Sequence, residues 1–347
     1  KEKFLFKINN DSIYQKIISN PRKKFFNPEY TNTLKTISKN FSDFYNGNIA
    51  RKIIKTVNES SNPGFFDISD FQTYEAKKQK ALCYKLANGL KLCGPNLPSS
   101  GTICLIQALV IYENILKTSK SVSLDQTLSI LNYIYYIRSR NLADPEFEKI
   151  NLKKLLDEKE LLKNFKIFEK KSRIKELVNA NELLNSTSHF TIVDSFGNVV
   201  SATSSIESSF GSRLFTNGFF LNNQLTDFSF KNKDEFNNLI KNRVEGGKRP
   251  LSSMSPIIIL DKYNKPFLTV GSPGGKAIIS YVFKVLIDIL YKDLDVKNSI
   301  ESPNYIKINE KTYFENESLK KFSSENQSTI RKLTSGLAVI KKTKEGF

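Results

Sequence analysis

Three consecutive hydroxyl side chains stand directly before a strand-like stretch near the middle of the chain, in the sequence NSTSHFTIVD. Ser186, Thr187 and Ser188 are followed by His189, the only histidine. A hydroxyl becomes a nucleophile when a base takes its proton, and in a Ser-His-Asp triad that base is a histidine. Because side chains alternate along a strand, Thr187 and His189 would lie side by side on one face. The His189 ring would then point alongside the hydroxyl, which disfavours a histidine base.

Another base needs no histidine. A threonine at a chain's N-terminus can use its own α-amine as the general base. That amine has an unperturbed pKa of about 7.7–8.0, so much of it is neutral near physiological pH. The bond between Ser186 and Thr187 would have to break, and the charged segment 166–186 reads as a solvated linker that tolerates a break. Taken alone, the hydroxyls are more simply a polar entry to a strand.

Two downstream segments suit the binding of an anion. The sequence RPLSSMSP places Ser252 and Ser253 between two prolines, which restrict the backbone and would pre-orient the hydroxyls toward a carboxylate. The sequence GSPGGKAII, residues 271–279, is a glycine turn that runs into a helix. Free N–H groups at a helix N-terminus attract negative charge and can form an oxyanion hole.

A third segment offers groups for a cation. The sequence LNNQLTDFSF contains Gln224 and Asp227, whose oxygens could accept hydrogen bonds from a ligand ammonium. The chain thus holds, in separate segments, a candidate nucleophile, an anion site and an ammonium site.

The 347 residues are 39% hydrophobic and 12% aromatic, so the chain can bury a sizeable core as one large or two ordinary domains. No uncharged apolar window reaches the length of a membrane span. The net charge of +18 comes mainly from scattered lysines without an arginine-rich, aromatic stripe, so a nucleic-acid binder is disfavoured.

Cys83, Cys93 and Cys104 do not have the spacing of a zinc site. We expect them to be small buried residues or free thiols, and we expect neither a metal nor a cofactor. They leave the redox compartment open.

The first half of the sequence predicts mainly helices, and the second half mainly strands. A hairpin is predicted around Asn88-Gly89 and another at the SFGN turn that contains Gly197. Helices are predicted at about 30–59, 102–116, 124–139, 144–165 and 275–292. This pattern favours layers of helix and sheet over alternating βαβ units.

In combination, these segments resemble the γ-glutamyltransferase (glutathione hydrolase) family. The resemblance runs from about Tyr30 to Phe347 and is densest after Thr187. It rests on the order and spacing of five blocks: TSHFTIVDSFGNVVSATSS, FGSRL, FFLNNQLTDFSF, KRPLSSMSP and GSPGGKAII. The resemblance implies an α+β fold, the N-terminal nucleophile αββα sandwich with two stacked antiparallel sheets between helix layers. It also implies a precursor that cleaves itself into a large and a small subunit, which remain together as a heterodimer.

The resemblance assigns catalytic roles. Thr187 would attack the carbonyl of Ser186, and after cleavage it would be the nucleophile that takes a γ-glutamyl group from glutathione or another γ-glutamyl compound. Water or an amino acid would then release that group. Gly274 and Gly275 would form the oxyanion hole, and Ser205 stands where the family has a threonine that hydrogen-bonds the nucleophile.

The resemblance also assigns substrate contacts. Ser252 and Ser253 would bind the substrate α-carboxylate, while Gln224 and Asp227 would bind its α-ammonium. Glu207 stands where many members have an asparagine that contacts the ammonium. A carboxylate can also accept from an ammonium, but the change could equally signal a different acyl group. A related amidase or acylase, of the cephalosporin or glutaryl type, and an inactive homologue with a binding role therefore stay open.

The resemblance divides the chain at the cleavage site. Residues 1–186 would be the C-terminal part of the large subunit and residues 187–347 the small-subunit region, both in one αββα domain. The family's N-terminal portion carries an arginine that pairs with the substrate α-carboxylate, and we expect this chain to be a fragment that lacks it and the C-terminal tail. The chain's own arginines stand in other contexts: Arg22, Arg51, Arg138, Arg140, Arg173, Arg213, Arg243, Arg249 and Arg331. The resemblance favours a periplasmic or secreted protein, although no leader opens this sequence.

Overall fold

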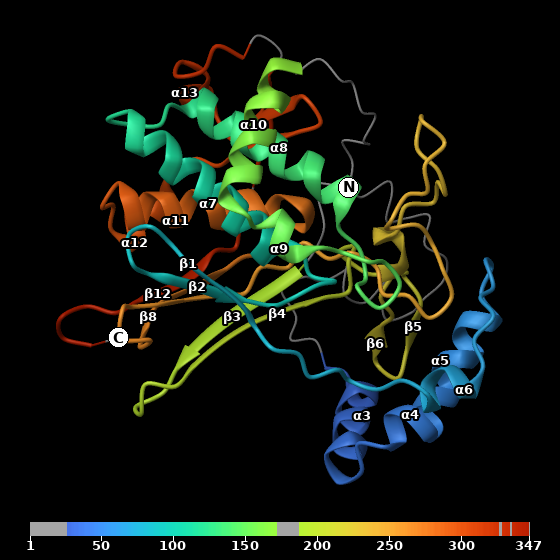
Figure 1. The fold of residues 1–347 in the computed structure, drawn as a ribbon. Helices are drawn as coiled ribbons and strands as arrows, with labels where there is room; N and C mark the ends of the chain where they lie inside the picture. Colours follow the sequence, from blue (N-terminus) through green and yellow to red (C-terminus); the bar gives the residue numbers. More distant parts are fainter. Residues whose placement is uncertain (1–25, 172–186, 326–327, 334, 347) are drawn as a thin grey trace. The chain divides into compact units, whose positions relative to one another are not determined.

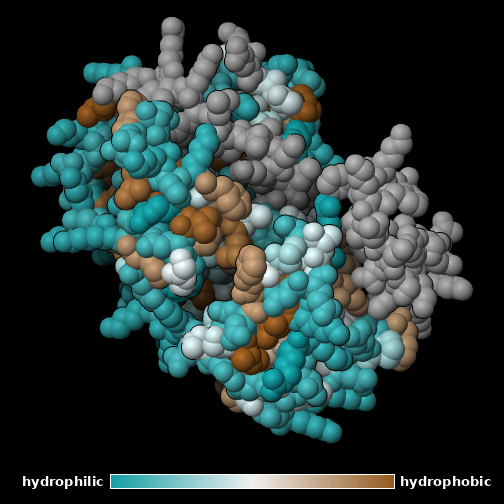
Figure 2. All heavy atoms as spheres, turned by 90° about the vertical axis from the view of Figure 1, so that its right-hand side faces the viewer, coloured by the Kyte–Doolittle hydropathy of each residue, from teal (hydrophilic) through white to brown (hydrophobic). Residues whose placement is uncertain are grey.

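The computed structural model describes residues 26–171, 187–325, 328–333 and 335–346. The chain forms two compact units, a smaller one from residues 1–78 and 210–223 and a larger one from residues 79–209 and 224–347. Among the described helices, none is both long and apolar enough to cross a membrane. The face seen in Figure 2 is mainly hydrophilic, with apolar side chains in small separate areas.

The smaller unit is built from short amphipathic helices and a two-stranded hairpin. One face of α5 (Asn48–Asn58) is buried through Ile49, Ala50 and Ile53. Helix α3 is hydrogen-bonded to the turn between β5 and β6, because Thr33 Oγ1 donates to the Asn217 carbonyl at 2.8 Å. The other elements are α3 (Pro28–Lys39), α4 (Asp43–Asn46), α6 (Ile68–Gln72), β5 (Phe215–Thr216) and β6 (Phe219–Phe220).

The larger unit contains a five-stranded antiparallel sheet with the order β1-β2-β7-β8-β12. Its strands are β1 (Leu82–Lys85), β2 (Lys91–Gly94), β7 (Ile257–Leu260), β8 (Pro266–Gly271) and β12 (Ala338–Lys341). The hairpin predicted around Asn88-Gly89 is confirmed as β1–β2. Cys83 and Cys93 lie directly opposite each other in it and form a disulfide, so the expectation of free thiols was wrong for these two. Cys104 is free and buried, as predicted.

Helices cover one face of this sheet (Figure 1). They are α7 (Gly101–Thr118), α8 (Leu124–Asn141), α9 (Leu152–Leu155), α10 (Glu158–Lys171), α11 (Ile278–Tyr291) and α12 (Val296–Glu301). Helix α7 is buried from Gly101 to Glu113 and lies inside the core, with Ile103, Leu105 and Leu109 fully buried. Burying each such side chain contributes about 1.5–3 kcal/mol relative to leaving it exposed.

The helix predicted at 144–165 was wrong in its first part, where α9 and α10 are preceded by a turn. Asp144 is fully buried there and accepts hydrogen bonds from Arg249 Nε at 3.0 Å and from Arg249 Nη2 at 2.9 Å. This buried ion pair across the fold outweighs the local preference for helix.

The strands β3 (Thr187–Val193) and β4 (Val199–Ser205) pair as the second predicted hairpin and stack on the other face of the five-stranded sheet (Figure 1). Thr191 Oγ1 bonds Thr269 Oγ1 across the layers at 2.9 Å. The His189 ring fills the space where Gly271 lacks a side chain, because a Cβ there would lie 2.2 Å from the ring. The layers run helix, sheet, sheet, which is the predicted α+β class.

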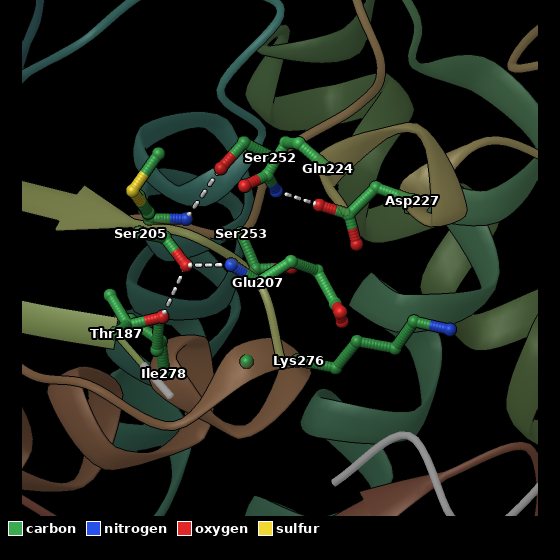
Figure 3. A pocket seen from close by; sticks show the side chains of 11 residues that line it. Thr187, Ser205, Glu207, Gln224, Asp227, Ser252, Ser253, Lys276 and Ile278 are labelled. Atoms are coloured by element: carbon green, nitrogen blue, oxygen red, sulfur yellow. Dashed lines mark hydrogen bonds between the residues drawn. The ribbon is translucent and has the colours of Figure 1, made fainter. Parts of the chain in front are cut away.

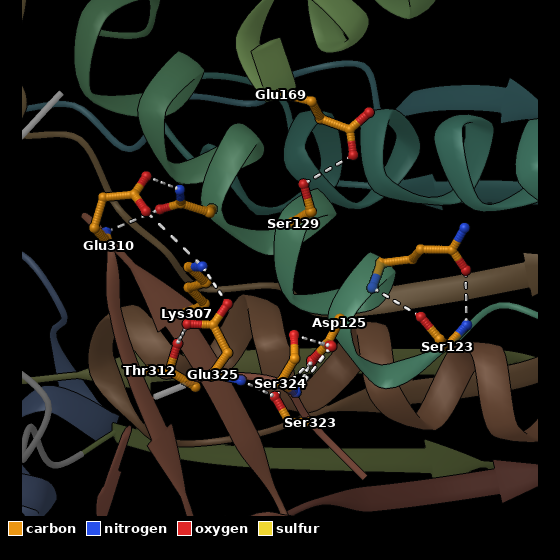
Figure 4. Close-up of polar contacts among 12 residues, drawn as sticks. Ser123, Asp125, Ser129, Glu169, Lys307, Glu310, Thr312, Ser323, Ser324 and Glu325 are labelled. Carbon is orange, nitrogen blue, oxygen red and sulfur yellow. Dashed lines mark hydrogen bonds and ion pairs between the residues drawn. The ribbon is translucent and has the colours of Figure 1, made fainter. Parts of the chain in front are cut away.

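A small three-stranded sheet packs against α8 within the larger unit. It has the order β11-β10-β9, from β9 (Tyr305–Ile308), β10 (Lys311–Phe314) and β11 (Ser328–Ile330), with α13 (Glu317–Lys320) between the last two. Figure 4 shows how polar contacts fix it: Asp125 of α8 accepts from the Ser324 amide at 2.9 Å. Within the small sheet region, Lys307 pairs with Glu325 at 2.6 Å.

Candidate active site

Thr187 is the first residue of β3 and lies directly opposite Ser205, the last residue of β4. The two hydroxyl oxygens are 3.1 Å apart. Ser205 Oγ also accepts from the Glu207 backbone N–H at 2.9 Å (Figure 3). Ser205 can therefore donate to Thr187 while its own position is fixed by the backbone that follows the strand.

The predicted site residues come from five separate places in the chain and meet in one pocket. The pocket is partly open, and the empty space in and directly in front of it is about 310 Å³, which includes open solvent. Its lining includes the predicted residues Thr187, Ser205, Glu207, Gln224, Asp227, Ser252, Ser253 and Gly275, together with Met254, Lys276 and Ile278. Gly274 is the neighbour of Gly275, and Ser186 lies outside the described residues.

Ser252 and Ser253 are held by the start of α7. The Ser252 N–H donates to the Pro98 carbonyl at 3.0 Å, and the Ser252 carbonyl accepts from the Ser100 N–H at 2.9 Å. Ser252 Oγ accepts from the Met254 N–H at 3.1 Å, so it keeps its own proton for donation into the pocket. The segment that presents both hydroxyls is thus fixed at its backbone.

The two glycines have backbone conformations that other residues adopt only with strain. Gly274 has φ 136° and Gly275 has φ 56°. A Cβ on Gly274 would also lie 2.6 Å from the Tyr281 ring. They lead into the short 3-10 helix η3 (Gly275–Ala277) and then α11, whose first N–H groups have no acceptor within the helix. Gly275, at the start of η3, lines the same pocket as Thr187.

Gln224 and Asp227 both lie on the short 3-10 helix η2 (Gln224–Asp227), at the opposite end of the pocket from Thr187 in Figure 3. Gln224 Nε2 donates to Asp227 Oδ2. Burial raises the pKa of Asp227 to about 6, with the nearby Glu207 charge adding to it and the Arg138 charge and the Gln224 bond opposing it. A bound ammonium would favour the ionised carboxylate.

Glu207 is buried and has φ 71°, which is left-handed backbone. Its Oε2 accepts from Ser208 Oγ at 2.6 Å. Left-handed conformations are strained for most side chains but tolerated by asparagine. The backbone at this position therefore suits an asparagine better than the glutamate found here.

His189 forms its hydrogen bond with a residue other than Thr187. Its Nδ1 hydrogen-bonds Thr203 Oγ1 on β4 at 2.8 Å, and burial lowers its pKa. Thr203 lies directly opposite His189, just as Ser205 lies opposite Thr187. The ring thus serves the packing between the two sheets.

Two cations near the pocket were missed from the sequence. Lys276 lines the pocket. Arg138 of α8 lies outside the lining and is linked to it through Ser100. The Arg138 Nε donates to Ser100 Oγ at 2.8 Å, and Ser100 Oγ donates to the Ser252 carbonyl at 2.6 Å. Lys276 directly follows the two predicted glycines, so its position was a usable signal. Arg138 lies in an ordinary helical stretch that gives none.

Comparisons with known proteins identify the family of the chain. The sequence model of the gamma-glutamyltranspeptidase family matches residues 10–347. The chain belongs to the gamma-glutamyltranspeptidase family. The glutathione hydrolase proenzyme of Escherichia coli K12 is 31% identical over 289 residues, which are 79% of this chain and 49% of that protein. The corresponding proenzyme of Bacillus subtilis 168 is also 31% identical, over 291 residues, 77% of this chain and 48% of its own.

This chain spans about half the length of the curated relatives that it matches. Among solved structures, the crystal structure of cephalosporin acylase from Bacillus halodurans has a TM-score of 0.76 at 15% identity, covering 98% of this chain and 65% of that one. The chain therefore shares the α+β fold of that acylase, and α+β is the fold class that the sequence predicted.

Proposed function

We propose that the protein containing this chain is a γ-glutamyltransferase and glutathione hydrolase with Thr187 as its nucleophile. The observation that carries the proposal is the position of Thr187, at the start of a strand, 3.1 Å from the Ser205 hydroxyl and in one pocket with acidic, hydroxyl and backbone N–H groups. Residues 1–186 and 187–347 would then belong to the large and small subunits of a heterodimer.

The first reaction would be cleavage of the precursor. Thr187 Oγ attacks the carbonyl carbon of Ser186, the peptide C–N bond breaks, and the acyl group passes to the hydroxyl oxygen as an ester. Water hydrolyses that ester, which leaves a carboxylate on Ser186 and a free α-amine on Thr187. This amine is the base that the unprocessed chain lacks.

The second reaction would be acyl transfer. The Thr187 amine takes the hydroxyl proton as Oγ attacks the γ-carbonyl, and the N–H groups at Gly274 and Gly275 stabilise the oxyanion. The amine of the product leaves with that proton, and water or an amino-acid acceptor then releases the γ-glutamyl group from Thr187. Each group is aimed at charge that appears during the reaction.

The substrate's head group suits the rest of the pocket. A γ-glutamyl group carries an ammonium and a carboxylate on one carbon. Asp227 and Glu207, with Gln224, offer acceptors to the ammonium, and Ser252 and Ser253 offer donors to the carboxylate. The presence of both kinds of group supports a zwitterionic acyl donor over an apolar one.

Glu207 favours one alternative, an acylase on the same fold that takes another acyl group. The named neighbour, cephalosporin acylase, is similar in fold alone. A comparison of release from γ-glutamyl and glutaryl anilides decides between them, because only the first carries the ammonium. Faster release from the glutaryl anilide would favour the acylase.

The decisive experiment uses the full-length natural protein and its Thr187→Ala variant. We expect the natural protein to purify as two polypeptides whose second begins with Thr187, and the variant to remain one chain without turnover. N-terminal sequencing, mass spectrometry and γ-glutamyl anilide release measure this. A folded natural protein that stays uncut would contradict the proposal, and would favour an inactive homologue with a binding role.

A further inference from the structure

Ser272 lies between the end of β8 and the two glycines beside the pocket, and its side chain is fully buried. Its Oγ donates to the Pro273 carbonyl at 2.8 Å and accepts from the Gly336 N–H at 3.3 Å. A hydroxyl has one proton, so the N–H of Gly336 occupies a lone pair and leaves that proton to the Pro273 carbonyl. Ser272 does not line the pocket itself.

The Pro273 carbonyl belongs to the same peptide unit as the Gly274 N–H. This peptide bond is trans, and a trans peptide is planar, with its C=O and N–H pointing in opposite directions. A group that fixes the carbonyl therefore also fixes the direction of the N–H. Through the bond to Pro273, the Ser272 hydroxyl determines the orientation of the Gly274 N–H.

The peptide between Pro273 and Gly274 has two accessible orientations. β-Turns of types I and II differ by a rotation of the central peptide plane, and a glycine after it permits both. Gly274 has φ 136°, in the positive range that the type II orientation requires. Rotation to the other orientation would reverse the N–H and break the bond to Ser272. The hydroxyl therefore stabilises one of the two orientations.

The register of the sheet explains why Gly336 reaches Ser272. Strand β12 pairs with β8 so that Ala338 lies opposite Gly271. The same antiparallel register, continued beyond both strands, brings Gly336 opposite Pro273. A Cβ on Gly336 would lie 2.5 Å from Pro273 Cγ. The segment before β12 can approach this closely because glycine has no side chain, and its N–H then meets the Ser272 hydroxyl.

We propose that Ser272 is a positioning residue, which aims the Gly274 N–H at the oxyanion formed when Thr187 attacks the acyl donor. Gly336 holds the Ser272 hydroxyl in place for this task. The inference rests on the proposed function. A serine that merely stabilised the turn would affect all ligands equally, whereas a positioning residue acts on the transition state and not on the binding of the head group.

The test applies Ser272→Ala to the full-length enzyme and uses two inhibitors with the same head group. In 2-amino-4-boronobutanoate, boron accepts an electron pair from the Thr187 oxygen and becomes a tetrahedral anion, while the Thr187 amine takes the hydroxyl proton. Norvaline carries a methyl group in place of the boronate and forms no anion. The first inhibitor therefore depends on the oxyanion donors, and the second does not.

We expect kcat for the γ-glutamyl anilide to fall about 10-fold in Ser272→Ala, with KM within about twofold. This loss is smaller than the roughly 100- to 1,000-fold effect of removing an oxyanion donor, because the Gly274 N–H remains and loses only its fixed orientation. The inhibition constant of the boronate should rise about 10-fold, and that of norvaline should stay within about twofold.

Three further variants sharpen the result. Ser272→Thr keeps the hydroxyl and should retain most activity. Gly336→Ala presses a Cβ against Pro273 and displaces the N–H donor, so it should give the same pattern of losses as Ser272→Ala. The matched control is Ser299→Ala on α12, which removes the hydroxyl of another fully buried serine, bonded to Asp288 and outside the pocket lining. It should leave kcat and both inhibition constants unchanged.

The outcomes separate the two proposals. Equal rises in both inhibition constants in Ser272→Ala, or no rise in either, would overturn the positioning role while the natural enzyme still turns over its donor. If Ser272→Ala does not fold, the same comparison in Gly336→Ala decides. A folded natural protein that stays uncut and releases no anilide would overturn the proposed function, and the role of Ser272 with it.

Discussion

The hairpins β1–β2 and β3–β4 each place one pair of side chains directly across antiparallel strands, but the pairs are of different kinds. Cys83 and Cys93 are joined covalently in the first, at the edge of the five-stranded sheet. Thr187 and Ser205 in the second are joined by a contact of 3.1 Å between two oxygens. Directly opposed residues lie close enough for either kind of link.

In both hairpins, pairing across the strands brings two reactive side chains close together. The surrounding residues decide whether such a pair stabilises the fold or takes part in a reaction. The disulfide consumes both reactive groups and closes a loop. The hydroxyl pair leaves the Thr187 oxygen free to react, within a pocket that also holds charges and N–H donors. One hairpin should therefore matter for stability and the other for chemistry, and four experiments test that division.

The largest expected effect is a loss of stability in the hairpin β1–β2. Replacing both Cys83 and Cys93 by serine reopens a loop with a sequence separation of 10. Loop-closure entropy predicts a loss of about 3 kcal/mol in unfolding free energy. Thermal or urea unfolding measures it, with chemical reduction of the natural protein as a second route. Activity well below the melting temperature should not change, and a raised KM in this variant would break the comparison.

The next effect is on the hairpin assigned to chemistry. Ser205→Ala removes the oxygen that contacts Thr187 and accepts from the Glu207 N–H. We expect cleavage and kcat to fall about 10- to 100-fold, since Thr187, the proposed nucleophile, loses its orientation and the Glu207 N–H loses its acceptor. Ser205→Thr keeps the hydroxyl and should retain most activity.

Ser204→Ala, one position earlier and exposed, is the matched control for Ser205→Ala. Rates of precursor cleavage on gels and of anilide release measure both variants. An equal loss in both variants would assign the effect to the strand rather than to the hydroxyl.

The third effect depends on pH. The pKa of Asp227 is raised to about 6, so the carboxyl gains a proton as pH falls through 6 and then no longer attracts an ammonium. KM for the γ-glutamyl anilide should rise about tenfold between pH 7 and pH 5. Asp227→Asn should have a high KM that is flat over this range. A natural enzyme with equal KM at both pH values would contradict the assignment.

The smallest effect concerns the residue after β4. Glu207→Asn should stabilise the protein by up to about 1 kcal/mol, because asparagine adopts left-handed backbone with less strain. Glu207→Gln removes the same charge without easing the backbone, so it should not stabilise. The difference between their melting curves isolates the backbone term, and a more stable glutamine variant would contradict it.

Local sequence signals predicted both hairpins. Asn88-Gly89 and Gly197 mark turns, and the strands around them alternate with a period of two. The disulfide could also have been predicted, because Cys83 and Cys93 are equally distant from residue 88 at the centre of the first hairpin. The residues that the family blocks named lie together in one pocket, since each block is a local sequence with a fixed place in the fold.

The parts that escaped prediction depend on contacts between distant segments. Asp144 leaves the expected helix because Arg249 binds it. Arg138 contacts the segment that holds Ser252 through Ser100 and through the Leu251 carbonyl. No local pattern in the sequence records such pairings, because each partner is ordinary in its own segment.

Strand β3 begins at Thr187, and this gives the proposed cleavage a place in the order of events. The Thr187 hydroxyl meets Ser205 only after β3 and β4 have paired in register. Cleavage would then follow the pairing of β3 with β4. The fraction of cleaved chain would therefore report the fraction of molecules in which these two strands have paired. A gel of freshly made protein, sampled over time, would read out a folding step without any spectroscopic probe.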